Sequence, residues 1–362
     1  MANQNIRTPR FYTDIINHLL ASGTAQDGNF DVVATAGGAT GTIGIQNGSE
    51  AELFDMRPLN KVDFNTSSTV DGHVLINLNL STFKKSFIAI LNHNLATAVG
   101  KIRIFAGDEA TDVSAKDGAN ADTGDISWND VAVAEVVNAD AITTAASNRS
   151  KVIEPTTDGS TIITFPEKDL RYWGIQFEGN TTNTGNADNG TWGSTDLFVG
   201  CILVGEYYDM PHAPDLAVKR SISFDGMNNV QESLGGQRFS NATSFGRTGT
   251  TTTLSPFNNA IYQNKVYSGR LVFNMSFSYL NSTDIMPNEY DDSNLSDDAV
   301  VEDIWHKTRG SHIPFIFSID KDSNGDNAES EHLFARFGQN SLDMSQVAND
   351  IWNISMRIEE EF

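Results

Sequence analysis

The stretch His73-Val-Leu-Ile-Asn-Leu-Asn-Leu80 decides the fold class of this 362-residue sequence. Its apolar side chains at positions 74, 76, 78 and 80 recur at every second residue, which is the period of a β-strand with one buried face. The same alternation returns along most of the chain, in residues 86–91, 101–105, 161–165, 171–177, 197–206, 270–279, 313–319, 332–337 and 351–358. The sequence therefore predicts an all-β protein.

Two segments have helical patterns instead. The first begins with Thr8 as N-cap and Pro9 at the first helical position, and it ends before Gly23. The second covers residues 297–309, with acidic residues in its first turn and basic residues in its last, as the helix dipole favours. We expect a short helix at the start of the chain and one helix inserted among the later strands.

The chain is longer than one hydrophobic core usually serves, so we expect two domains. Met210-Pro-His-Ala-Pro214 is the best boundary, because two closely spaced prolines do not continue a β-ladder. Short strands separated by turn-forming residues favour a sandwich or a barrel in both parts. We predict a helix and a β-sandwich in residues 1–210, and an antiparallel β domain with one helix in residues 211–362.

The composition excludes several classes of protein. A formal net charge of −23 repels phosphate and disfavours a conventional nucleic-acid binder. The single cysteine, Cys201, excludes an internal disulfide framework and a cysteine-based zinc site. Neither a signal peptide nor an apolar membrane-spanning stretch is evident, so we expect synthesis in a cytoplasm and no membrane association.

Catalytic motifs are scarce. The sequence contains no Gly-x-Ser-x-Gly nucleophile elbow, no His-Glu-x-x-His pair and no phosphate-binding P-loop. A pair of carboxylates suited to glycoside hydrolysis stays open, because only their separation in space would identify it. We expect a protein that is not an enzyme and needs no cofactor, with calcium as the one metal that the sequence suggests.

A calcium-loop pattern occurs near the end of the chain. Oxygen ligands stand at alternating positions around a turning glycine, and a glutamate closes the loop. The segments on either side alternate like strands, whereas an EF-hand needs helices there. A polar β-hairpin tip would explain the same residues, so both interpretations stay open. The candidate ligands are Asp320, Asp322, Asn324, Asp326 and Glu331.

Three residues are candidates for contact with a glycan or a partner protein. Trp192 lies in a polar, loop-like context, where its ring could stack on a sugar or on a neighbouring subunit. The alternative is a tryptophan that anchors its own loop to the core. Asn92 and His93 end a predicted strand, where they could bind a ligand or fix the strand end by hydrogen bonds.

Charge is segregated in the second half of the chain. Residues 284–303 hold eight acidic residues and no lysine or arginine, whereas basic residues outnumber acidic ones in residues 211–270. A head-to-tail ring would bring such unlike surfaces together, although a solvated acidic loop explains the pattern equally well. The candidate interface residues are Asp291, Asp292, Asp297, Asp298, Arg220, Arg238 and Arg247.

Two sets of passages resemble bacteriophage virion proteins. Phe87–Leu95, Lys101–Phe105, Arg171–Phe177 and Phe198–Glu206 are similar to jelly-roll, galactose-binding-like modules of tail proteins. A second set resembles the tail-tube-related β domains of distal tail and tail-tip proteins: Ser221–Phe224, Gly235–Arg238, Pro314–Ile319, Phe334–Phe337 and Trp352–Glu361. The distal tail proteins place these two kinds of domain in the opposite order.

The resemblance implies a structural virion protein of the phage tail, made in the host cytoplasm. It would form a homo-oligomeric ring, often a hexamer, at the tail tip or baseplate. The ring would join the tail tube to the hub or fibres, and DNA would pass through its lumen without specific binding. The alternatives are a carbohydrate-binding adhesin, a fibre adaptor, a capsid-decorating protein and a polysaccharide hydrolase. The C-terminal strand, which ends in Glu359-Glu-Glu361, is a candidate for an exposed edge that a neighbouring subunit completes.

Overall fold

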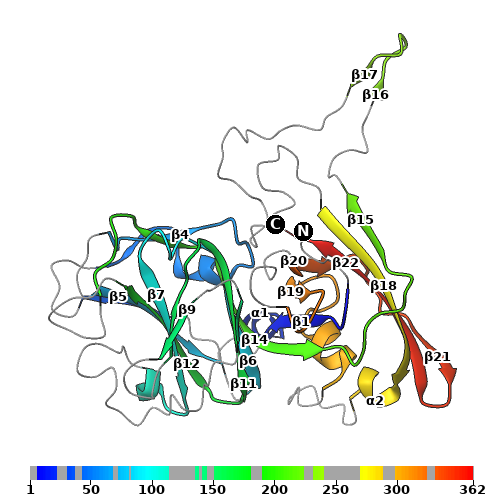
Figure 1. Cartoon of the computed structure of the whole chain (residues 1–362), viewed down its shortest axis with the longest axis horizontal. Coiled ribbons are helices and arrows are strands. Elements are labelled where there is room, and N and C mark those ends of the chain that lie inside the picture. The colour runs from blue at the N-terminus through cyan, green and yellow to red at the C-terminus, as the bar shows by residue number, and fades with distance from the viewer. Residues whose placement is uncertain are drawn as a thin grey trace.

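The prediction of an all-β protein is confirmed, because antiparallel strands dominate the fold and the helices are short. The computed structural model has two halves, side by side in Figure 1. It describes residues 6–22, 31–36, 43–67, 72–80, 83–113, 135–137, 141–144, 151–180, 190–223, 231–239, 270–287, 298–323 and 331–361.

The first half is a sandwich of two antiparallel sheets. One sheet has the order β2 (Asp31–Ala36), β5 (Gly72–Asn79), β12 (Tyr172–Gly179), β7 (Gly100–Gly107), β10 (Lys151–Glu154) and β9 (Ala141–Thr144). The other contains β14 (Cys201–Asp209), β6 (Lys85–His93), β11 (Gly159–Lys168) and β8 (Glu135–Val137). Phe165 and Trp173 stack between the sheets, with ring centroids 5.1 Å apart. Alternate residues of the facing strands form this core, as the period of two predicts.

Smaller elements close the sandwich. The strands β3 (Ile45–Asn47), β4 (Val62–Phe64) and β13 (Leu197–Val199) form a three-stranded sheet. The 3₁₀ helices η2 (Glu50–Phe54) and η3 (Ala110–Val113) lie in the connections. Leu53 and Phe54 of η2 are buried, so this turn closes one end of the core.

The second half is a curved sheet that wraps around two short helices (Figure 1). Its strands run in the order β15 (Lys219–Ser223), β18 (Arg270–Asn281), β22 (Ile351–Glu360), β20 (His332–Phe337) and β19 (Phe315–Ser318), and β21 (Met344–Ala348) also pairs with β22. The helices are α2 (Ser282–Ile285) and the π-helix η7 (Val300–His306), which is shorter than the helix predicted over 297–309. Apolar side chains from the concave face and from both helices form a second core.

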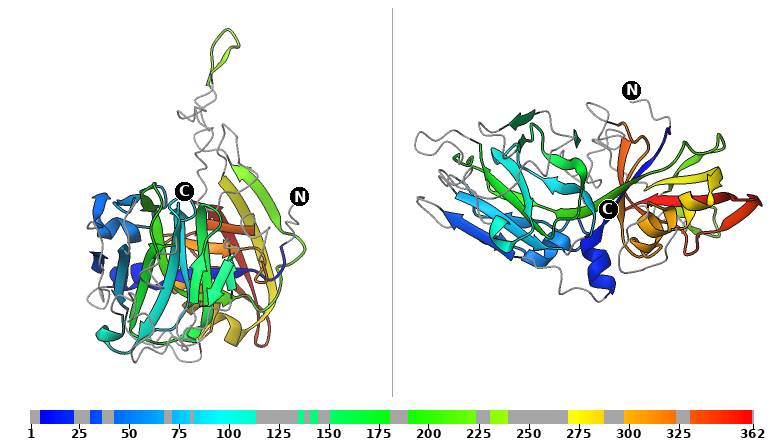
Figure 2. Two further views of the ribbon diagram at one scale, coloured as in Figure 1. Left: turned by 60° about the vertical axis from the view of Figure 1, so that its left-hand side comes forward. Right: turned by 90° about the horizontal axis from the view of Figure 1, so that it is seen from below.

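The strand β1 (Arg10–Asp14) joins the two halves. It pairs with β14 of the first half on one side and with β19 of the second half on the other. Among the described residues, ten strands therefore run without a break from β15 to β8, and β21 beside β22 completes an 11-stranded sheet. Figure 2 shows β1 crossing between the halves. The division into domains at residues 210 and 211 stays a prediction.

The predicted start of the first helix is wrong. Residues 10–14 are extended, and the helix α1 covers Ile15–Ser22. The extended form lets Phe11 enter the core of the second half while Tyr12 enters a separate cluster on the central sheet. The Asp14 carboxylate accepts a hydrogen bond of 2.7 Å from the Asn17 amide, so Asp14, and not Thr8, caps the helix.

A buried ion triad also connects the halves. The Lys307 ammonium, after η7, lies 2.8 Å from Glu206 Oε2 on β14 and 2.7 Å from Asp303 Oδ1 on η7. Burial raises the pKa of Glu206 to about 7, and it also raises the pKa of Asp303. The two carboxylates raise the pKa of Lys307 against the opposing effect of burial. The ammonium therefore holds two carboxylates that burial would otherwise favour in the neutral form.

The prediction that the C-terminal strand is an exposed edge is also wrong. β22 pairs with β18 on one side, and with β20 and β21 on the other. Its alternate residues Ile354, Met356 and Ile358 are buried in the second core. Within the described residues, the open edges of this region are β15 and β21. In the part of the chain that the structure describes, no helix is long and apolar enough to cross a membrane.

Candidate functional site

The strand β15 is one open edge of the second half. Among the strands that the structure describes, its five residues pair only with β18, from Lys219 opposite Asn274 to Ser223 opposite Arg270. Four of the five are exposed, and the side chain of Ile222 is 49% exposed although β-branched apolar residues favour burial. The outer side of β15 thus presents backbone groups and an apolar side chain to whatever lies beside it.

The strand β21 is the other open edge. It pairs with β22 through a tight turn at Asn349-Asp350, in which Asp350 has a φ of +56°. All of its residues except Met344 are exposed, and Val347 is 53% exposed. This strand was not predicted from the sequence, because it has no buried alternation. The turn-forming pair Asn349-Asp350 is the signal that could have located it.

The two edges differ in charge. Lys219 and Arg220 lie on β15, and both are exposed. Asp343 and Asp350 flank β21, and residues 338–356 contain no lysine or arginine. β15 pairs with the start of β18, whereas β21 lies beside the part of β22 that pairs with the end of β18. The basic and acidic edges therefore occupy opposite corners of one four-stranded unit, which Figure 1 shows at the right.

The predicted interface residues are scattered. Arg220 lies on the open edge β15, with its guanidinium 5.7 Å from the centre of the Phe273 ring. The Asp298 side chain is exposed, and it lies 3.9 Å from Lys84 of the first half. Arg238 belongs to β17 (Arg238–Phe239), and Asp291, Asp292, Asp297 and Arg247 lie outside the described residues.

Arg238 is part of a small hairpin that stands apart from both sheets in Figures 1 and 2. The hairpin consists of β16 (Gln231–Glu232) and β17, and a turn at Gly236 connects them. Leu234 at its tip is fully exposed. An apolar side chain in such a position is a further surface that a neighbouring molecule could cover.

The calcium-loop residues lie at a β-hairpin between β19 and β20, so helices of the EF-hand kind do not flank them. The Asp320 carboxylate lies 3.2 Å from the Arg7 guanidinium and also accepts a hydrogen bond from the backbone amide of Asp322. Glu331 accepts a hydrogen bond from the Ser323 hydroxyl. Asn324 and Asp326 lie outside the described residues, so only part of the candidate ligand set can be placed.

Trp192 lies in the core of the sandwich, with 2% of its surface exposed. Its indole N–H donates to the carbonyl oxygen of Gly72 at 2.8 Å, and its ring fills the space above Gly100. This burial corrects the interpretation of Trp192 as a stacking platform, because its ring has no free face for a sugar. The tryptophan holds its own segment against the core.

Asn92 and His93 make internal hydrogen bonds. The Asn92 side chain donates to the carbonyl oxygen of Pro58 at 2.6 Å, and the His93 ring lies 2.8 Å from the Thr161 hydroxyl. Burial lowers the pKa of His93 to about 4, so the imidazole is neutral at physiological pH. Both residues fix the end of β6, as the alternative interpretation of the sequence proposed.

Among the described residues, one group of carboxylates is close enough together to hold a metal ion. Single oxygens of Glu167, Glu206 and Asp298 lie within 4.8 Å of one another. Lys84 lies 3.1 Å from Glu167 and 3.9 Å from Asp298, and Lys307 pairs with Glu206. Because two lysines already pair with these carboxylates, the arrangement is an ion-pair network that connects Lys84, β11 and β14 to the second half.

Comparisons with known proteins identify no family. No family model matches the sequence, and no curated protein matches it significantly. Among solved structures, a chitosan-binding module of a chitosanase/glucanase from Paenibacillus sp. IK-5 aligns with 15% identity and a TM-score of 0.28. The alignment covers 50% of this chain and 97% of the module.

Proposed function

We propose that this chain is a structural subunit of a bacteriophage tail, and that it forms a ring at the tail tip that joins the tube to the hub or fibres. The observation that carries the proposal is the pair of open edges, basic at β15 and acidic at β21, on one four-stranded unit. Unpaired edge strands recruit other strands, and opposite charges orient the contact.

Pairing of β15 with β21 of the next copy joins two different surfaces, so the contact is head to tail. Repetition of that contact closes into a ring when the rotation between subunits divides a full turn. The two edges lie at opposite corners of the unit, which staggers successive subunits in the way that a closed sheet requires.

The net charge of the chain also suits a protein that lines a DNA channel. A chain of net charge −23 offers phosphate no general attraction, which suits a channel through which DNA passes without binding. In this proposal the second half lines the ring, and the first half projects outward toward tail fibres or the host.

The test is the mass of the purified protein in solution, measured by light scattering after size exclusion, together with negative-stain images of the same fraction. Closed rings of several subunits support the proposal. A monomer at every concentration, with no ring in the images, contradicts it.

A further inference from the structure

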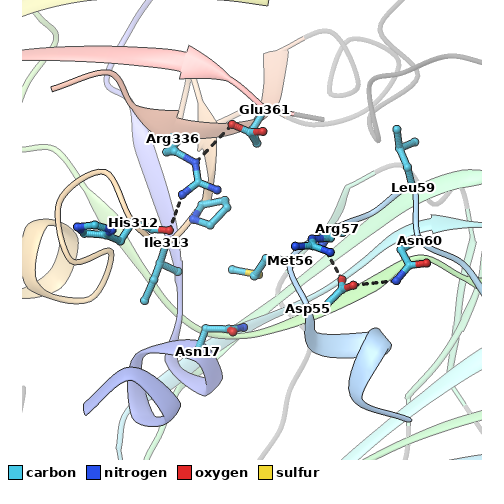
Figure 3. A pocket seen from close by; sticks show the side chains of 11 residues that line it. Asn17, Asp55, Met56, Arg57, Leu59, Asn60, His312, Ile313, Arg336 and Glu361 are labelled. Carbon is cyan, nitrogen blue, oxygen red and sulfur yellow. Dashed lines mark hydrogen bonds and ion pairs between the residues drawn. The ribbon is translucent and has the colours of Figure 1, made fainter. Parts of the chain in front are cut away.

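A cavity of about 720 Å³ opens between the two halves (Figure 3). One wall is the turn of residues 55–60, which follows η2. The other wall is formed by Ile313 and Pro314 together with Arg336 of β20 and Glu361. A volume of this size lies within the range of small-ligand sites in proteins, roughly 300–1,000 Å³.

The turn of residues 55–60 is held in one conformation. The Asp55 carboxylate accepts hydrogen bonds from the Arg57 amide at 2.8 Å and from the Asn60 side chain at 2.9 Å. The Pro58 carbonyl oxygen accepts a hydrogen bond from the Asn92 side chain. Met56 has a φ of +58°, a strained conformation for a residue with a side chain, and such strain often marks binding sites. The wall is therefore formed before any ligand arrives.

The opposite wall is equally fixed. Arg336 Nη1 donates to the carbonyl oxygen of Ser311 at 3.0 Å and also to that of His312. Its Nε lies 3.4 Å from the Glu361 carboxylate, which also pairs with Arg270 at 3.2 Å. These bonds hold a planar guanidinium and a planar carboxylate at the cavity edge, and Figure 3 shows both across from Arg57.

The polar groups of the cavity suit a neutral ligand that both donates and accepts hydrogen bonds. Asp55 and Glu361 balance the charges of Arg57 and Arg336, so an ion of either sign gains little from the lining as a whole. The Arg57 guanidinium has no partner among the described residues, so its N–H groups are available as donors. The carboxylates keep unused lone pairs as acceptors, and a hydroxyl group can use both kinds of partner.

Apolar side chains also line the cavity. Met56 and Ile313 belong to one buried cluster on the central sheet, and both line the cavity. Leu59, at the rim, is 42% exposed. A ligand with hydroxyl groups and a C–H face would match a lining that combines these polar and apolar side chains. We propose that this cavity binds a neutral oligosaccharide, with Arg57 and Asp55 as hydrogen-bonding residues. The site is separate from the open edges, so it does not depend on ring formation.

The test is isothermal titration of the full chain with lactose, maltotriose and cellotriose, and with trigalacturonate as a charged comparison. We expect at least one neutral sugar to bind. Arg57→Met should weaken that binding about tenfold, because one hydrogen bond to a charged group is lost. Leu59→Ala should weaken it about threefold, by loss of apolar contact. Both side chains are solvent-accessible, so both variants should fold, which circular dichroism would verify.

The matched control is Lys168→Gln, which removes one positive charge from β11. Lys168 lies opposite Lys85 at the start of β6, whereas Asn92, which bonds to Pro58 in the cavity wall, is near the other end of that strand. It should leave the affinity unchanged. Three outcomes would each overturn the proposal: no neutral sugar binds at millimolar concentration, trigalacturonate binds more tightly than every neutral sugar, or Arg57→Met binds as the wild type does.

Discussion

Replacement of Lys307 by methionine tests the account of the junction between the halves. The substitution keeps most of the apolar stem but removes the ammonium that lies 2.8 Å from Glu206 and 2.7 Å from Asp303. All three side chains are at least 92% buried, so two carboxylates lose their counter-charge away from water. Breaking a buried pair in this way costs about 3–5 kcal/mol. We expect a loss of that size in the free energy of unfolding at pH 8, measured by urea denaturation.

The loss in the free energy of unfolding should become smaller as the pH falls. A carboxyl group whose folded pKa is raised contributes stability below its unfolded pKa and loses it as the pH rises through the folded value. In the wild type this window lies between the ordinary pKa of glutamate and about 7 for Glu206. Removal of the Lys307 ammonium raises the pKa values of Glu206 and Asp303 further. The difference between variant and wild type should therefore shrink from pH 8 to pH 5, by up to about 1.4 kcal/mol per pH unit for each extra proton bound.

Two further variants make this result specific. Lys84→Met removes a partly exposed ammonium from the neighbouring ion pairs and should cost less than about 1 kcal/mol, with little pH dependence. The triple variant Lys307→Met/Glu206→Gln/Asp303→Asn should recover most of the loss, because no buried charge is left unpaired. An equal loss at pH 5 and pH 8, or an equal loss in Lys84→Met, would refute the reasoning.

Two other predictions concern the joining strand and the calcium loop. Gly205→Ala should destabilise the protein by about 3 kcal/mol, because its Cβ would lie 1.9 Å from the Thr13 carbonyl oxygen between β1 and β14. Gly44→Ala, where the Cβ meets nothing within 4 Å, is the control and should change the melting temperature little. Calcium should not raise the melting temperature of the wild type, because Arg7 and Ser323 already bond to Asp320 and Glu331. A calcium-dependent rise that disappears in Asp320→Ala/Glu331→Ala would show instead that the hairpin binds the ion.

The sequence predicted those strands that bury one face. In β5 and β22, buried residues alternate with more exposed ones along part of the strand, so the period of two is visible in the residue types. Residues 10–14 leave no such pattern, because Phe11 and Tyr12 enter different cores and all five residues of β1 are buried. Thr8 and Pro9, which precede these residues, then suggested a helix that begins too early.

The order of strands within a sheet is not written in local patterns. β22 is the last strand along the chain. In the sheet it nevertheless lies between β18 and β20, because its buried residues pack in the same core as those of both neighbours. The edge strand β21 is short and exposed, so it leaves no apolar alternation to detect. The burial of Trp192 depends on Gly72 and Gly100, which are distant in sequence, and its polar neighbours therefore suggested an exposed ring.

In the proposed ring the oppositely charged edges β15 and β21 pair between copies, and a charge exchange tests this contact most directly. One variant carries Lys219→Glu and Arg220→Glu, and the other carries Asp343→Lys and Asp350→Lys. Each variant alone should remain monomeric by light scattering, and an equimolar mixture should form rings, because the reversed β15 of one variant meets the reversed β21 of the other. The control Lys168→Glu/Lys321→Glu changes the net charge as the first variant does, away from both edges, and should assemble normally. If each single variant assembles as the wild type does, or if the mixture stays monomeric while the wild type forms rings, the edges are not the contact.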